Sequence, residues 1–200
     1  EVEGRSKTGW GGFMSRYNAL VEAAVLEGLD KEKGETSARM ALARFLVGHE
    51  LAFEAIGVLN DLARERPRVL NDAEFRGLRG ISRVMARRDK EASADFSAPV
   101  LSDEASAALW RSLLASRTAQ WPEARREFAA GAAAFNQFPE LWRARFARAD
   151  ARAALAMGDL DGAQSRIRLA LDQTKDPIEQ LETRLLQAEL AERRSDSGPA

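Results

Sequence analysis

The sequence MGDLDGAQSRIRLA, residues 157–170, follows an alanine-rich run. Gly158 and Asp159 interrupt the helical pattern, because both residue types favour turns. Gly162 and Ala163 lack bulky side chains, so the next helix can begin close against the first. We interpret this stretch as the turn of a helical hairpin. Looser copies of the same pattern occur at residues 51–55 and 120–124. The chain is therefore predicted to be an array of such hairpins.

The composition favours helices throughout. Ala, Leu, Arg and Glu dominate, whereas Val, Ile, Thr and Tyr are scarce, so little is available to build sheets. We expect an all-α fold, an α-solenoid of antiparallel helical hairpins with about nine or ten helices. Residues 1–14 are predicted to be an irregular lead-in, residues 15–194 a single helical repeat domain and residues 195–200 a flexible tail.

Several local expectations accompany this fold. One continuous helix is predicted over residues 121–139, and a short, weak one over 90–96. The last helix is predicted over residues 176–194, with apolar residues on one side and charged residues on the other. The residues assigned to that apolar side are Ile178, Leu181, Leu185, Ala188 and Leu190.

Charge and residue usage exclude several classes of function. The chain has 30 Lys and Arg against 31 Asp and Glu, so no net charge drives binding to nucleic acid or to an anionic membrane. It has no cysteine, and its one histidine, His49, has no second histidine to share a metal or a proton-transfer reaction. No nucleotide-binding or metalloprotease motif occurs. We therefore expect a non-catalytic chain without metal or cofactor and without a membrane-inserted segment.

The hairpins resemble tetratricopeptide repeats. Ala55, Ala92, Ala124 and Ala163 open the predicted second helices, and their separations of 37, 32 and 39 residues bracket the period of that family, which is about 34 residues. The best copy carries Leu42, Ala43, Leu46, Ala55, Leu59, Leu62 and Pro67. The last copy carries Ala151, Ala154, Gly158, Asp159, Ala163, Ile167 and Ala170. The resemblance covers residues 36–173 and implies a superhelical stack of hairpins.

The same resemblance implies a concave groove, lined by the first helix of each hairpin, that holds peptides or partner helices. The candidate partner-binding residues on this surface are Arg44, Arg117, Arg145, Arg148 and Arg152, to which Trp121 is added as an edge aromatic. Arg145, Arg148 and Arg152 share one helix face, and Arg76, Arg79, Arg83 and Arg87 form a second basic stripe. Guanidinium groups bind carboxylates well, which favours an acidic partner segment. The alternative is that these stripes are solvated faces whose arginines pair with nearby Glu and Asp.

The function predicted is that of a protein-protein interaction or scaffold module. Its partner would be another protein or another segment of the parent chain, because the first residues, EVEGRSKTG, suggest an excerpt of a larger protein. One alternative is a regulatory or substrate-recruiting domain of a larger enzyme. Another is a structural spacer that self-associates through residues 178–190. The Ala- and Arg-rich usage is typical of a bacterial protein, of the cytoplasm or the periplasm.

Overall fold

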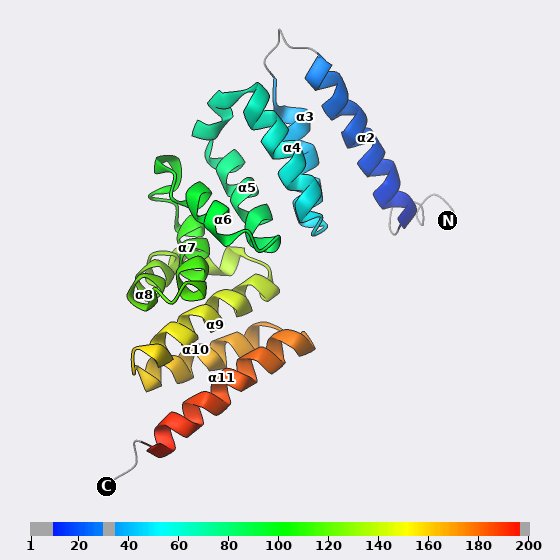
Figure 1. Cartoon of the computed structure of the whole chain (residues 1–200). Coiled ribbons are helices and arrows are strands. Elements are labelled where there is room, and N and C mark those ends of the chain that lie inside the picture. The colour runs from blue at the N-terminus through cyan, green and yellow to red at the C-terminus, as the bar shows by residue number, and fades with distance from the viewer. Residues whose placement is uncertain (1–9, 30–34, 197–200) are drawn as a thin grey trace. The chain divides into compact units, whose positions relative to one another are not determined.

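The computed structural model describes residues 10–29 and 35–196. Over these ranges the chain contains ten α-helices, α2 to α11, and three short 3-10 segments, η1 to η3, with no strand (Figure 1). The predicted all-α fold is confirmed. None of these helices is long and apolar enough to cross a bilayer. The chain divides into two compact units, the first ending at Leu101 and the second beginning at Ser102. A single domain over 15–194, and a solenoid, stay predictions.

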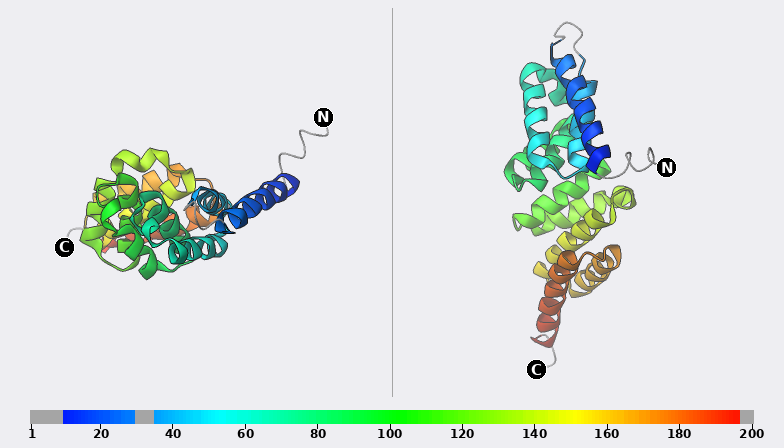
Figure 2. Two further views of the ribbon diagram at one scale, coloured as in Figure 1. Left: turned by 90° about the horizontal axis from the view of Figure 1, so that it is seen from above. Right: turned by 90° about the vertical axis from the view of Figure 1, so that its right-hand side faces the viewer.

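The first unit contains two helix pairs, α3 with α4 and α5 with α6, and the further helix α2, which packs on α3 at an angle (Figure 2). Pro67 lies one residue beyond the end of α4 at Glu65 and starts a 3-10 turn. The side chain of Asp72 accepts a hydrogen bond from the backbone N–H of Phe75 and caps α5. The elements are α2 (Trp10–Leu29), α3 (Ser37–Gly48), α4 (Ala52–Glu65), η1 (Pro67–Asn71), α5 (Ala73–Met85), α6 (Asp89–Phe96) and η2 (Pro99–Leu101).

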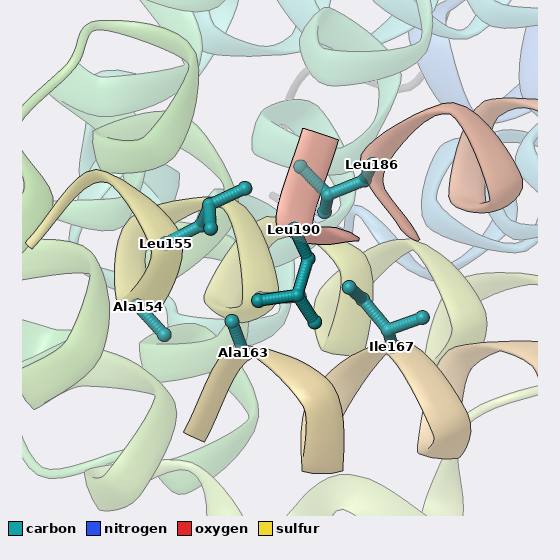
Figure 3. Packing of buried hydrophobic residues seen from close by; sticks show 7 residues of the cluster. Ala154, Leu155, Ala163, Ile167, Leu186 and Leu190 are labelled. Carbon is teal, nitrogen blue, oxygen red and sulfur yellow. The ribbon is translucent and has the colours of Figure 1, made fainter. Parts of the chain in front are cut away.

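The second unit contains the pairs α7 with α8 and α9 with α10, and the further helix α11, which packs on both α9 and α10. Its core includes Leu155 of α9, Ile167 of α10, and Leu186 and Leu190 of α11, which lie side by side in Figure 3. The elements are α7 (Ala105–Arg117), α8 (Trp121–Ala130), η3 (Ala132–Gln137), α9 (Glu140–Ala156), α10 (Leu160–Gln173) and α11 (Pro177–Asp196).

One turn geometry joins the two helices of all four pairs. In each turn one residue has a positive φ: Glu50 at 60°, Arg87 at 60°, Ala119 at 57° and Gly158 at 79°. The N–H of the following residue donates to the carbonyl five positions earlier, as in Asp159 N to Ala154 O at 2.9 Å and Gln120 N to Ala115 O at 2.9 Å. This hydrogen bond and the left-handed residue define a Schellman helix end. The turn predicted at residues 157–170 is therefore repeated in the other three pairs.

The four alanines that set the repeat spacing occupy equivalent places in these pairs. Ala55, Ala92, Ala124 and Ala163 each lie five positions after a left-handed residue, and each is 0% exposed. Their small side chains let the second helix of a pair lie close to the first. The regular spacing in the sequence thus corresponds to one helix-pair geometry. Membership of the tetratricopeptide family stays a prediction.

Three boundaries differ from the predicted ones. Helix α2 begins at Trp10, so residues 10–14 are helical, because Phe13 finds a packing partner in Phe45, with ring centroids 5.2 Å apart. The helix predicted over 121–139 ends at Ala130, and the chain continues as the 3-10 segment η3. Gly131, between the two, packs so closely on α7 that a Cβ there would lie 2.5 Å from the Leu109 side chain. Helix α11 reaches Asp196, two residues into the predicted tail. Residues 1–9 and 197–200 lie outside the described ranges.

Candidate functional site

Two of the predicted partner-binding arginines bind an acidic segment of the chain itself. Arg145 Nε donates to Glu179 Oε1 at 2.6 Å, and Arg148 Nη1 donates to Glu179 Oε2 at 2.5 Å. The other Nη of Arg148 lies 2.6 Å from Glu182 Oε2. Glu179 is buried near the start of α11, so both of its carboxylate oxygens are neutralised by α9. These arginines attach α11 to α9.

The other residues predicted in the second unit do not gather into one site. Trp121 is half-buried and packs against Ala115, Ala124 and Ala153, so it contributes to the core at the start of α8. Arg152 is exposed on α9, and Arg117 lies half-buried at the end of α7.

Three arginines of the second basic stripe bind one buried carboxylate in the first unit. Asp95 of α6 is 0% exposed and accepts hydrogen bonds from Arg76 Nη1 at 2.9 Å, Arg79 Nη2 at 2.6 Å and Arg83 Nη1 at 2.5 Å. The three guanidinium groups project from successive turns of α5 and hold α6 in place. Arg87 lies beyond this cluster, in the left-handed position of the turn. The alternative was thus right about pairing with carboxylates of the chain, but Arg79 and Asp95 are buried and do not form a solvated face.

A similar arrangement occurs in the second unit around Asp150 of α9. Its Oδ2 accepts hydrogen bonds from Arg125 Nη1 at 3.2 Å and from Arg166 Nε at 2.9 Å. Burial raises the pKa of Asp150 above its ordinary value, and the two guanidinium groups oppose that shift only in part. Asp150 therefore joins α8, α9 and α10.

Arg44 is the predicted site residue that lies in an open surface groove. The groove runs between α2 and α3, has a volume of about 560 Å³ and belongs to the first unit. Its lining combines aromatic rings, cations and small residues. The lining residues are Gly12, Phe13, Arg16, Leu20, Ala41, Arg44, Phe45, Gly48 and His49.

The apolar part of this groove is an aromatic cluster at one end of α3. Phe13 of α2 contacts Phe45 and His49, with ring centroids 5.2 and 5.0 Å apart, and the rings of Phe45 and His49 are 4.2 Å apart. His49 Nδ1 lies 2.8 Å from the carbonyl oxygen of Phe45, which fixes the orientation of the imidazole. The cluster is therefore a preformed aromatic surface.

The charged part of the groove is positive. Arg16 is exposed on α2 and forms no ion pair among the described residues, and Arg44 pairs with Glu74 of α5 through both oxygens of that carboxylate. The side chains of Arg44 and Glu74 are each about half exposed. The hydrogen bond from Arg44 lowers the pKa of Glu74 below its ordinary value, and burial opposes this shift in part. Such an exposed pair is exchangeable, because it contributes only about 0–1 kcal/mol.

Helix α2 is held against α3 by a separate ion-pair network. Arg39 Nε of α3 donates to Glu27 Oε1 at 3.0 Å, and Arg39 Nη1 donates to Glu65 Oε2 at 2.6 Å. The backbone N–H of Ala38 also donates to Glu27, at 2.6 Å. Because the side chains of Arg39 and Glu27 are both buried, this network fixes the C-terminal end of α2 beside the first turn of α3.

The sequence reasoning missed most of this groove. Phe13 and Tyr17, and likewise Phe45 and His49, are four residues apart, so each pair lies on one helix face. That repeated spacing on consecutive helices was the available signal. Within residues 10–29 and 35–196 no three His, Cys, Asp or Glu side chains are placed to hold a metal ion. Comparisons with protein-family models, with curated proteins and with solved structures found no match to this chain.

Proposed function

We propose that the chain is a non-catalytic protein-interaction module, whose groove between α2 and α3 holds a short acidic segment of another protein. The observation that carries this proposal is the combination, in one open groove, of an aromatic cluster with Arg16 and Arg44. An acidic segment that also carries an aromatic or aliphatic side chain would contact both parts.

The aromatic cluster supplies the apolar contact of this proposal. Phe13 and Phe45 are only half-buried, so part of each ring is exposed to solvent in the groove. When partner side chains cover these exposed rings, the binding free energy becomes more favourable by about 25 cal/mol for each Å² of apolar surface removed from water. The rings lose little entropy on binding because their contacts with each other already orient them.

Arg16 and Arg44 supply the positive charge of the groove. Arg16 would bind a carboxylate of the partner without giving up any ion pair that the described residues make. Arg44 would exchange Glu74 for a partner carboxylate at little cost, since both groups are half exposed and Glu74 remains hydrated. Arg145 and Arg148 of α9 contribute nothing comparable, because Glu179 already occupies them. Of the arginines predicted to recognise an acidic segment, the proposal therefore keeps Arg44 and leaves out Arg145 and Arg148.

The test uses a short fluorescein-labelled peptide that alternates aspartate with phenylalanine and glycine, titrated with the whole chain and followed by fluorescence anisotropy. We expect saturable binding that weakens as salt is raised, because the charged contacts are exposed. The double variant Arg16→Gln, Arg44→Gln should raise the dissociation constant about tenfold.

The matched control is Arg64→Gln, Arg68→Gln, which removes the same charge from exposed positions outside the groove of the same unit. This control variant should bind the peptide like the unmodified chain. A peptide in which asparagine replaces aspartate separates charge from apolar contact, and it should bind more weakly. Equal losses for the two double variants, or no saturable binding of the acidic peptide, would overturn the proposal.

A further inference from the structure

Helix α11 has an inner and an outer face, and both carry apolar side chains. Leu186 and Leu190 point inward, beside Leu155 and Ile167 of the neighbouring helices (Figure 3). Ile178, Leu181 and Leu185 are 68%, 61% and 64% exposed, and Ala188 is exposed beside them. We call these four outer residues the α11 seam. The predicted apolar side, which placed Leu190 together with Ile178, is therefore wrong.

The spacing of the seam is that of a coiled-coil interface. Its residues follow one another at intervals of three, four and three positions, so they occupy successive a and d sites of a heptad pattern. The inner residues of α11 lie on the opposite side of the helix and pack on α9 and α10. A second helix can thus approach the seam from solvent without disturbing the core of the second unit.

The charged residues beside the seam favour a second copy of this chain as its partner. Arg184 and Glu189 flank it on opposite sides, five positions apart, at a g site and the following e site. In a parallel, in-register pair of α11 helices, Arg184 of each copy lies beside Glu189 of the other. In the antiparallel register that buries the whole seam, Arg184 would instead face Arg184 of the other copy. Like charges across such an interface are unfavourable.

We propose that two copies of this chain associate through the α11 seam, with their α11 helices parallel and in register. Each copy buries its own Ile178, Leu181 and Leu185 against the same residues of the other, and two Arg184–Glu189 pairs close the sides. Glu189 already pairs with Arg193 at 2.8 Å, but both side chains are nearly half exposed, so Glu189 can accept a second guanidinium group. This inference concerns the second unit and is independent of the groove between α2 and α3.

Sedimentation equilibrium of the whole chain tests the association directly. We expect a concentration-dependent dimer, and we expect Leu181→Glu to raise its dissociation constant more than tenfold. The control is Leu26→Glu on α2, because Leu26 is also 61% exposed and lies outside the seam. A chain that stays monomeric up to about 200 µM, a concentration at which even weak dimers form, or equal effects of the two variants, would overturn the proposal.

Charge exchange tests the parallel orientation. Arg184→Glu and Glu189→Arg should each weaken the homodimer about tenfold, because each places like charges at both flanks. A mixture of the two variants should form a heterodimer, in which every flanking pair is again of opposite charge. Failure of the mixture to associate more tightly than either variant alone would contradict the parallel register.

Single cysteines give a second reading of the orientation, since the chain has none of its own. Leu185→Cys places the two thiols opposite each other in a parallel dimer, within disulfide reach, so mild oxidation with copper phenanthroline should yield a covalent dimer. Gln187→Cys, exposed but outside the seam, should not. Cross-linking only in a mixture of Leu181→Cys with Leu185→Cys would show an antiparallel pair and refute the assignment.

Discussion

Replacing Gly158 by alanine should lower the stability of the second unit through the backbone alone. Gly158 has a φ of 79°, and no heavy atom lies within 4 Å of the place that a Cβ would take. The left-handed conformation costs an L-residue about 1–2 kcal/mol. Alanine recovers about 0.4–1 kcal/mol by restricting the unfolded chain. The free energy of unfolding should therefore fall by about 1 kcal/mol.

The reciprocal change is available in the neighbouring turn. Ala119 has a φ of 57° and holds the equivalent left-handed position between α7 and α8. Ala119→Gly should raise the free energy of unfolding by about 0.5–1 kcal/mol, for the same reasons with the sign reversed. Because the two turns are separate, the double variant Ala119→Gly, Gly158→Ala should be close to the unmodified chain.

Urea unfolding followed by far-ultraviolet circular dichroism measures these differences. The slope of the unfolding free energy against urea should stay the same, and the midpoint should shift, because only the strain of the folded turn changes. In thermal unfolding, about 1 kcal/mol corresponds to a shift of about 4–8 °C for a unit of this size. A Gly158→Ala variant as stable as the unmodified chain, or an Ala119→Gly variant that is less stable, would refute the assignment of backbone strain to these turns.

Two further predictions concern the first unit. Gly80→Ala places a Cβ 2.7 Å from the buried ring of Phe96 and should lower the free energy of unfolding by about 1–2 kcal/mol. Gly77→Ala, whose Cβ would have no heavy atom within 4 Å, should raise the free energy of unfolding by about 0.5–1 kcal/mol. The urea midpoints of the two variants should therefore shift in opposite directions. Arg44→Gln should return the pKa of Glu74 toward its ordinary value in an NMR titration. Because that pKa is lowered in the folded chain, the stabilisation from this pair is present above the unfolded pKa and is lost as pH falls through the folded pKa. An unchanged Glu74 pKa would contradict this.

The helix pairs could be predicted from the sequence because their spacing depends on side-chain size. Ala55, Ala92, Ala124 and Ala163 are small where two helices approach, and this requirement is visible in a single sequence. The left-handed turn residues could be predicted only at Gly158, because glycine favours positive φ. At the other three turns, ordinary residues adopt the same conformation because the hydrogen bonds of the helix end impose it.

The partners of the basic stripes could not be predicted, although their placement on one helix face could. Arginines three or four residues apart share a face whether that face meets solvent, a partner or the chain's own carboxylates. Asp95 is the single carboxylate that binds three of them, and it lies on a helix predicted to be short and weak. Which helix packs on which determines this pairing, and that information is long-range.

The orientation of α11 shows why the same limit applies to its apolar residues. In its first turns the buried positions are Glu179 and Thr183, whereas Ile178, Leu181 and Leu185 face solvent. Burial of apolar surface alone would favour the opposite orientation of these turns. Two charge-assisted hydrogen bonds from α9 to Glu179 fix the orientation that exists, since a buried carboxylate without them would be strongly destabilising. Arg145 and Arg148, which were predicted to recognise a partner, therefore pair within the chain, and by holding Glu179 inward they keep the α11 seam exposed.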